Sequence, residues 1–148
     1  MRRSFCLWTT FALLAGGPPV AADDLSGADA LLCTAVEVTR CLPGGDCLSL
    51  PPWELNVPQF IEIDLEALTL ATTRASGQNR STPIRTLERE NGSIFLQGIE
   101  GGRAFSFVID EGSGLASIAI ARDSMAVTVF GACTPLSAAS STGGGGEE

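Results

Sequence analysis

The sequence predicts an all-β protein: an antiparallel meander of about 7–8 strands, forming a small barrel or a two-layer sandwich stapled by disulfides. Three observations support this class. Apolar and polar residues alternate with a period of two, most clearly from Arg103 to Asp110. Turn residues such as Asn91-Gly92 and Gly112-Ser113-Gly114 separate these runs at short intervals. Cysteines lie near both ends of the alternating region.

Residues 1–22 are expected to be a signal peptide. Arg2 and Arg3 precede an apolar run from Phe5 to Gly16, and Val20-Ala21-Ala22 supplies small residues at a cleavage site. The run is too short for a permanent membrane span, so we expect a periplasmic or secreted chain without a stable membrane anchor. The paired arginines also partly match a twin-arginine signal, which leaves the export route open.

Composition divides the rest of the chain into three parts. Residues 23–31 are polar and acidic and are expected to form a flexible lead-in. Residues 32–135 contain all the strand patterns and are expected to form a single β domain. Residues 136–148 are rich in glycine, serine and glutamate, which is typical of a disordered tail.

Four cysteines remain once Cys6 is removed with the leader, and an even number in an exported domain indicates two disulfides. Of the three possible pairings we favour Cys41–Cys47 with Cys33–Cys133. Pro43-Gly44 suits a tight turn between the first pair. The second pair would tie the first strand to the last. The spacing fits no zinc site or redox motif, so we expect no metal and no cofactor.

In the first half of the domain, Leu32 to Thr39 alternates as a strand does. Leu48 to Pro58 contains three prolines and is expected to be an extended loop. Phe60 to Leu65 is a strand pattern, with a reversal near Asp64-Leu65-Glu66. Ala67 to Thr73 then forms another strand, with a helix over 64–74 as the alternative.

In the second half of the domain, turn residues separate the strands more clearly. A polar strand from Thr82 to Arg89 is joined through the Asn91-Gly92 hairpin turn to a strand from Ile94 to Ile99. The next strands are Arg103–Asp110, Leu115–Ala121 and Met125–Phe130. Two of them, Ile94–Ile99 and Leu115–Ala121, are apolar on both faces. In a barrel this pattern indicates an outer face that is covered or meets a partner.

Composition excludes several chemistries. The chain has nine basic residues, all arginine, with 17 acidic residues and no histidine. Catalysis and metal binding that require histidine, or a lysine nucleophile, are therefore excluded. Losing Arg2 and Arg3 moves the formal charge from −8 to −10. Such an acidic protein is repelled by phosphate backbones, so we expect no nucleic-acid partner.

Aromatic residues are the candidates for ligand or partner contact. Trp53 is expected to plug one end of the core, or alternatively to stack on a ligand or contact a partner. Phe95, Phe105, Phe107 and Phe130 are expected to pack in the core, or alternatively to line an apolar pocket inside a barrel.

Glu62, Asp64 and Glu66 would share one face of an extended strand. Three carboxylates so placed could bind calcium. We favour instead a solvent-facing row that Arg85 and Arg89 neutralise from a neighbouring strand. Asp110 to Gly114 resembles a calcium loop only loosely and is expected to be a turn.

Short motifs across residues 33–134 resemble uncharacterised small secreted (periplasmic) proteins of proteobacteria. The matching segments are Leu96-Gln97-Gly98, Gly101-Gly102-Arg103-Ala104, Ile109-Asp110, Ser113-Gly114 and Phe130-Gly131-Ala132-Cys133-Thr134. The resemblance implies an exported β-protein with a disulfide between its N-terminal and C-terminal strands, and implies no activity.

Together these features predict a non-catalytic, exported β-domain that binds a protein partner or a small apolar ligand. A hydrolase that uses carboxylates is one alternative, because carboxylates are the remaining groups that can transfer protons. A periplasmic enzyme inhibitor is another, by analogy of architecture only.

Overall fold

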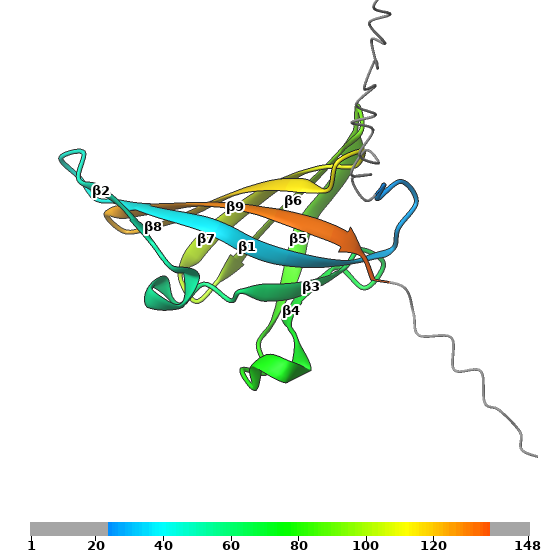
Figure 1. The fold of residues 1–148 in the computed structure, drawn as a ribbon, viewed down its shortest axis with the longest axis horizontal. Helices are drawn as coiled ribbons and strands as arrows, with labels where there is room; N and C mark the ends of the chain where they lie inside the picture. Colours follow the sequence, from blue (N-terminus) through cyan, green and yellow to red (C-terminus); the bar gives the residue numbers. More distant parts are fainter. Residues whose placement is uncertain (1–23, 137–148) are drawn as a thin grey trace, which may run out of the picture.

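The computed structural model describes residues 24–136, in which nine strands form one antiparallel sheet that closes into a barrel (Figure 1). The predicted signal peptide, residues 1–22, and the predicted tail, residues 136–148 apart from Leu136, lie outside the described residues. The all-β class is confirmed, and of the two architectures expected the barrel is the one formed.

The strands follow one another with short connections. They are β1 (Ala30–Cys41), β2 (Cys47–Leu50), β3 (Phe60–Asp64), β4 (Thr69–Thr72), β5 (Ser81–Glu90), β6 (Ser93–Glu100), β7 (Arg103–Asp110), β8 (Leu115–Arg122) and β9 (Met125–Pro135). Two short 3₁₀ helices, η1 (Pro52–Leu55) and η2 (Arg74–Ser76), lie in the connections after β2 and β4.

Eight strands make the barrel wall, in the order β1-β3-β4-β5-β6-β7-β8-β9, and β9 pairs back onto β1. The ninth strand, β2, is a short extension. It pairs only with the C-terminal part of β1, from Val38 to Cys41. Neighbours in the barrel are therefore mostly neighbours in sequence, as the regular spacing of the strand patterns predicts.

Closure depends on the long pairing between β1 and β9. The register runs from Leu31 opposite Pro135 to Cys41 opposite Ala126, with one β-bulge at Val36. The bulge leaves Val36 without a partner on β9. It also changes which residues of β1 point into the barrel, from odd-numbered positions such as Cys33 before the bulge to even-numbered positions such as Val38 after it. Gly131 lies beside it, and a side chain at Gly131 would overlap the carbonyl oxygen of Thr34.

Both predicted disulfides are confirmed. Cys33 and Cys133 are opposite each other on β1 and β9, and their bond is buried inside the barrel. Cys41, the last residue of β1, is bonded to Cys47, the first residue of β2, at the base of the turn between these strands. These are the bonds expected of a protein that folds in an oxidising compartment.

Several turns form as their residues predict. Asn91 and Gly92 both have positive φ angles, of 51° and 75°, which a two-residue hairpin of this type requires. At the β7–β8 turn, Asp110 accepts hydrogen bonds from the backbone N–H and hydroxyl of Ser113. These bonds, mainly the one from the hydroxyl, hold the pKa of Asp110 below its usual value.

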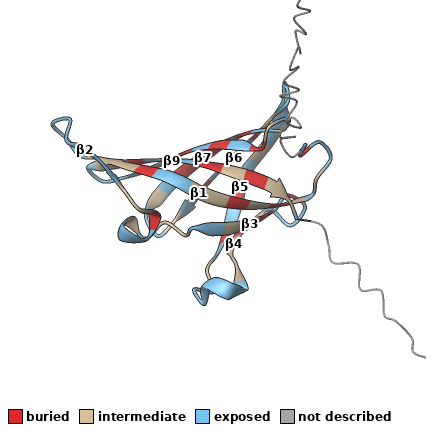
Figure 2. Ribbon diagram, viewed as in Figure 1, coloured by how far each residue is buried: buried red, intermediate tan, exposed pale blue. Residues whose placement is uncertain are grey.

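One end of the barrel is closed by the segment before β1. Leu25 is fully buried in the core cluster, and its backbone N–H donates to the carbonyl oxygen of Glu111 at the β7–β8 turn. Arg89 forms an ion pair with Glu111 at 3.1 Å and donates to the carbonyl oxygen of Ala28. Part of the expected flexible lead-in is thus a component of the core (Figure 2).

Other expectations need correction. The helix considered for 64–74 does not form, because the chain reverses after Asp64 and continues as β4. The expected loop from Leu48 to Pro58 contains part of β2 and the η1 turn. Arg89 does not neutralise the Glu62–Glu66 row, since its ion-pair partner is Glu111.

Removing the Cys33–Cys133 bond should destabilise the barrel more than removing Cys41–Cys47. The first closes a loop with a sequence separation of 100 and the second one of 6. In the chain-entropy model the losses are about 4–5 and about 2 kcal/mol. Urea unfolding of the two double Cys→Ala variants measures both values. Equal losses would contradict the assignment of Cys33–Cys133 as the closing bond.

Candidate functional site

The barrel interior contains a pocket that opens at the end opposite Leu25. Its volume is about 110 Å³. The inward side chains of six barrel strands form its apolar wall. They include Cys33, Ile61, Leu70, Phe105, Phe107, Ile118 and Val129. Because eight strands leave an interior just wide enough for side chains or one small ligand, a cavity of this size is what the strand number allows.

Two phenylalanines of β7 give the pocket its shape. Phe105 and Phe107 are both buried, and their rings meet edge to face with centroids 5.8 Å apart. On β6, Gly98 is opposite Phe105 and supplies the room for its ring. A side chain at Gly98 would overlap the Phe105 ring and approach the carbonyl oxygen of Pro83. The glycine therefore keeps the Phe105 ring close to the barrel wall.

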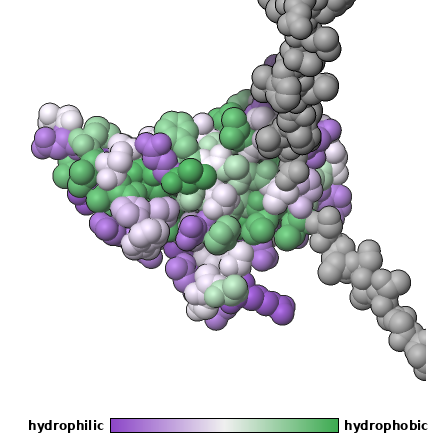
Figure 3. Space-filling model, viewed as in Figure 1, coloured by the Kyte–Doolittle hydropathy of each residue, from purple (hydrophilic) through white to green (hydrophobic). Residues whose placement is uncertain are grey.

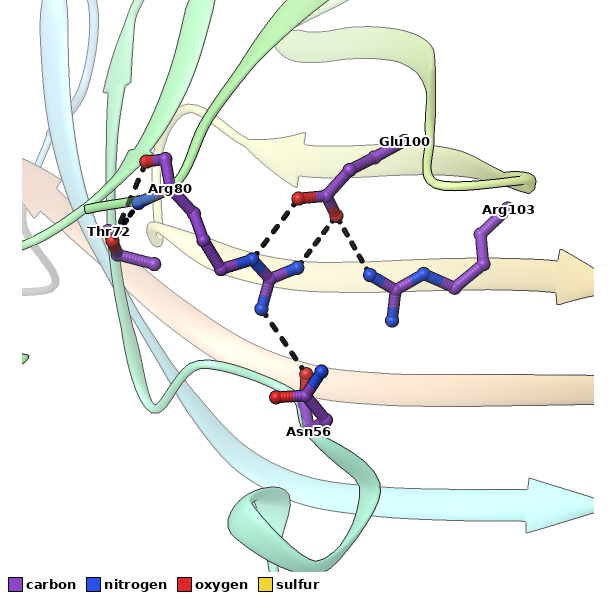
Figure 4. A network of polar contacts seen from close by, with 5 residues as sticks. All are labelled: Asn56, Thr72, Arg80, Glu100 and Arg103. Carbon is purple, nitrogen blue, oxygen red and sulfur yellow. Dashed lines mark hydrogen bonds and ion pairs between the residues drawn. The ribbon is translucent and has the colours of Figure 1, made fainter. Parts of the chain in front are cut away.

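A charged network stands at the mouth of the pocket (Figure 4). Arg80 donates from Nε to Oε1 of Glu100 at 3.2 Å and from Nη2 to Oε2 at 2.7 Å. Arg103 donates from Nη2 to the same Oε2 at 3.0 Å. One carboxylate thus holds two guanidinium groups in place, and all three side chains are only 21–30% exposed.

Strand alternation explains how β6 and β7 supply two of these groups. Glu100 continues the inward series of Ile94, Leu96 and Gly98 at the end of β6. Arg103 begins the inward series of β7 and is opposite Glu100 in the register. The β6–β7 hairpin therefore delivers an acid and a base side by side to the end of the pocket.

Arg80 comes from the connection before β5 and links the network to the opposite rim. Its backbone N–H donates to Oγ1 of Thr72 at 3.0 Å, at the end of β4. Its Nη1 donates to the carbonyl oxygen of Asn56 at 3.4 Å. Asn56 follows η1 and lines the pocket together with Val57 and Pro58. The network thus spans the mouth from the β6–β7 hairpin to the η1–β3 segment (Figure 4).

The network changes the acidity of Glu100. Burial alone would raise its pKa. The hydrogen bonds and charge of Arg80, followed by the Thr82 hydroxyl and the charge of Arg103, outweigh burial and hold the pKa below its usual value. Glu100 is therefore ionised at neutral pH and cannot donate a proton there. It is also the only carboxylate among the residues that line this pocket.

The structure separates the predicted aromatic candidates. Phe105 and Phe107 line the pocket, as expected of core or pocket residues. Phe95 and Phe130 do not belong to the core: they point outward and are 38% and 49% exposed. Trp53 does not plug the barrel, because it lies on η1 with 68% of its surface exposed.

Sequence reasoning missed Arg80, Glu100 and Arg103 as site residues. For Glu100 and Arg103 a signal was present, since each extends the inward series of an apolar strand with a charged residue. Arg80 gave no such signal. It lies just before the predicted strand of residues 82–89, and the antiparallel pairing of β5 with β6, in which Ile84 is opposite Gly98, brings it to Glu100.

A second surface feature is the outer side of β6–β9, which we call the uncharged wall. Apart from Asp110 at the end of β7, its main outward residues carry no formal charge: Phe95, Gln97, Ile99, Ala104, Ser106, Val108, Leu115, Ser117, Ala119, Ala121, Ala126, Thr128, Phe130 and Ala132. Figure 3 shows the part of the barrel surface where β9, the last strand of this wall, lies beside β1, and several hydrophobic side chains are exposed there. This agrees with the expectation that strands apolar on both faces have an outer side suited to contact.

Within residues 24–136, no helix is long and apolar enough to cross a membrane. No three histidine, cysteine, aspartate or glutamate side chains in this part of the chain come together as a metal site. Comparisons of the chain with protein-family models, curated proteins and solved structures find no match. The pocket and its mouth are therefore the basis for inferring a function.

The Glu100 network should contribute stability that disappears in acid. Because the folded pKa of Glu100 is lowered, its contribution is present above its unfolded pKa and lost as the pH falls through the folded value. Glu100→Gln should cost about 1 kcal/mol at pH 7, a modest value because the network is partly exposed. The cost should shrink below about pH 4.

Urea unfolding at several pH values measures this difference. Glu54→Gln is the matched control, because Glu54 is exposed on η1 and forms no ion pair within residues 24–136. A Glu100→Gln cost that stays constant down to pH 2–3 would show that the charge of Glu100 is not what stabilises the mouth.

Proposed function

We propose that the protein is a non-catalytic binding module that takes a small apolar ligand into its barrel. The observation that carries this proposal is the apolar pocket between Phe105, Phe107 and the facing strands, with Arg80, Glu100 and Arg103 at its mouth. Apolar walls with a few placed polar groups at the mouth are typical of small-molecule sites. The apolar interior supplies binding energy through burial of ligand surface.

The dimensions favour a ligand, or a ligand end group, about the size of one ring or a short branched chain. A cavity of about 150 Å³ lined by apolar side chains binds benzene in another protein. The pocket here is somewhat smaller, at about 110 Å³, but it is open at the mouth. A ligand can therefore seat its apolar end against Phe107 and Ile118 and leave its other end near Arg103.

The setting that we propose for this function is the periplasm or the exterior of the cell. The signal-peptide pattern of residues 1–22 supports export, and the two disulfides suit an oxidising compartment. A hydrolase with paired carboxylates would need a second acid beside Glu100, and within residues 24–136 no other carboxylate lines this pocket. The chemistry of the pocket thus favours binding.

Filling the pocket should weaken binding of an apolar probe. Ala116 is buried on β8 and lines the pocket, whereas Ala119 faces outward on the same strand. Ala116→Leu should reduce the affinity for benzene about tenfold or more, because its added carbons occupy the ligand volume. Ala119→Leu should leave the affinity unchanged.

Titration followed by ¹H–¹⁵N NMR measures this affinity and shows which residues respond. The expected shifts concentrate on β7 and β8. Equal affinities in the two variants, or no shift in the wild type at benzene saturation, would overturn the proposal. A thermal melt of each variant establishes that it is folded.

The uncharged wall favours a second function: weak pairing of two copies of this chain. One cross-strand row on the wall reads Phe95, Val108, Ser117, Phe130. A two-fold axis along the strands would place Phe95 of one copy opposite Phe130 of the other. Two copies that are both strongly acidic can approach with least repulsion through a surface whose single charge, Asp110, lies at the end of one strand.

The size of the wall sets the expected strength of pairing. Four strands of about eight residues cover roughly 500 Å². That area is below the roughly 800 Å² per partner of a standard interface, so pairing should be weak and depend on concentration.

Sedimentation velocity between about 10 µM and about 1 mM should show the average mass rising with concentration. Phe130→Glu should abolish the rise, because it buries a charge in the contact, opposite Phe95 of the other copy. Phe60→Glu is the control, since Phe60 is 45% exposed on β3 and lies off the wall. A wild type that stays monomeric at every concentration would overturn the pairing.

A further inference from the structure

We infer that the ligand of the barrel is an organic anion: a small apolar group that carries a carboxylate, which Arg103 binds at the mouth of the pocket. This inference rests on the proposed binding of an apolar ligand and adds the chemical class of that ligand. It follows from the hydrogen bonds of Arg103, from the role of Glu100, and from the distribution of charge along the barrel.

Arg103 has donor groups to spare. A guanidinium group carries five N–H donors, and carboxylates accept two of them side by side. Within residues 24–136, the guanidinium of Arg103 makes one hydrogen bond, from Nη2 to Oε2 of Glu100. The Arg103 side chain is 21% exposed and lines the pocket, so its remaining donors are available at the mouth.

Glu100 fixes Arg103 without neutralising the mouth. Both carboxylate oxygens of Glu100 are bound by Arg80, and one of them is shared with Arg103. Two guanidinium groups and one carboxylate leave a single positive charge beside the apolar pocket. Such a charge attracts an anion more strongly when the surroundings are partly desolvated, as they are here.

Charges elsewhere on the barrel direct an anion to the same end. Five of the seven arginines in residues 24–136 lie at the mouth end: Arg40, Arg74, Arg80, Arg103 and Arg122. Four acids lie at the same end: Asp46, Glu54, Glu100 and Asp123. The closed end carries one arginine, Arg89, and seven acids: Asp24, Asp29, Asp64, Glu66, Glu90, Asp110 and Glu111.

This asymmetry means that an acidic protein presents its least negative end around the pocket. An approaching anion is repelled by the closed end and guided toward the mouth. Arg40, also at the mouth end, is a further donor without an acceptor: its Nε is buried and has no hydrogen-bond partner in the described part of the chain. The electrostatic field and the donors of Arg103 thus select the same ligand charge.

The test compares benzoate with benzyl alcohol, two probes with the same ring and different charge, by ¹H–¹⁵N NMR titration at neutral pH. Benzoate should bind the wild type about 10- to 100-fold more tightly, as expected for hydrogen bonds to a charged group. Arg103→Gln should remove this preference by lowering the affinity for benzoate to about that for benzyl alcohol. Arg122→Gln, which removes a mouth-end arginine that does not line the pocket, should keep the preference.

The outcomes separate the inference from the proposed function. If benzyl alcohol binds in the barrel but benzoate binds no more tightly, the anionic ligand is wrong and the apolar pocket stands. If neither probe binds, the proposed function itself fails, and the inference with it. If Arg122→Gln reduces the preference as much as Arg103→Gln, the effect is general surface charge and the assignment to Arg103 is overturned.

Discussion

The antiparallel pairing of β1 with β9 is the interaction on which the rest of the molecule depends. It turns a meander with two unpaired edges into a closed wall, and closure removes the exposed edges that would otherwise pair with other chains. The Cys33–Cys133 bond joins the two strands from inside the barrel. The bulge at Val36, made possible by Gly131, lets the long first strand change its inward residues and still reach Cys41.

Closure also creates the asymmetry on which the proposed site depends. At one end Leu25 completes the core, while at the other the strands end in Glu100, Arg103 and their neighbours. The same alternation that buries Phe105 and Phe107 carries these charged residues to the mouth. An apolar interior and a polar opening are thus two consequences of one strand pattern. The pocket is therefore apolar inside and charged at its mouth.

Most of the fold could be predicted from the sequence because its signals are local. Alternation defined the strands, Asn91-Gly92 defined a hairpin, and the positions of the cysteines favoured the pairing that is formed. Two features of the core could not be predicted from the sequence, each for a physical reason. A strand that is apolar on both faces does not reveal which face is inside, so Phe95 and Phe130 were wrongly assigned to the core. Leu25 is a single apolar residue in a polar segment, and no periodicity marks it.

The β1–β9 pairing also sets the order of events during synthesis. These strands include residues with a sequence separation of 100, and β9 is the last strand of the described residues. The wall therefore cannot close until β9 has been synthesised, and contacts this distant in sequence form slowly. Until β9 has been made, the edge of β1 that pairs with it stays open, and Cys33 has to wait for Cys133 as its bonding partner.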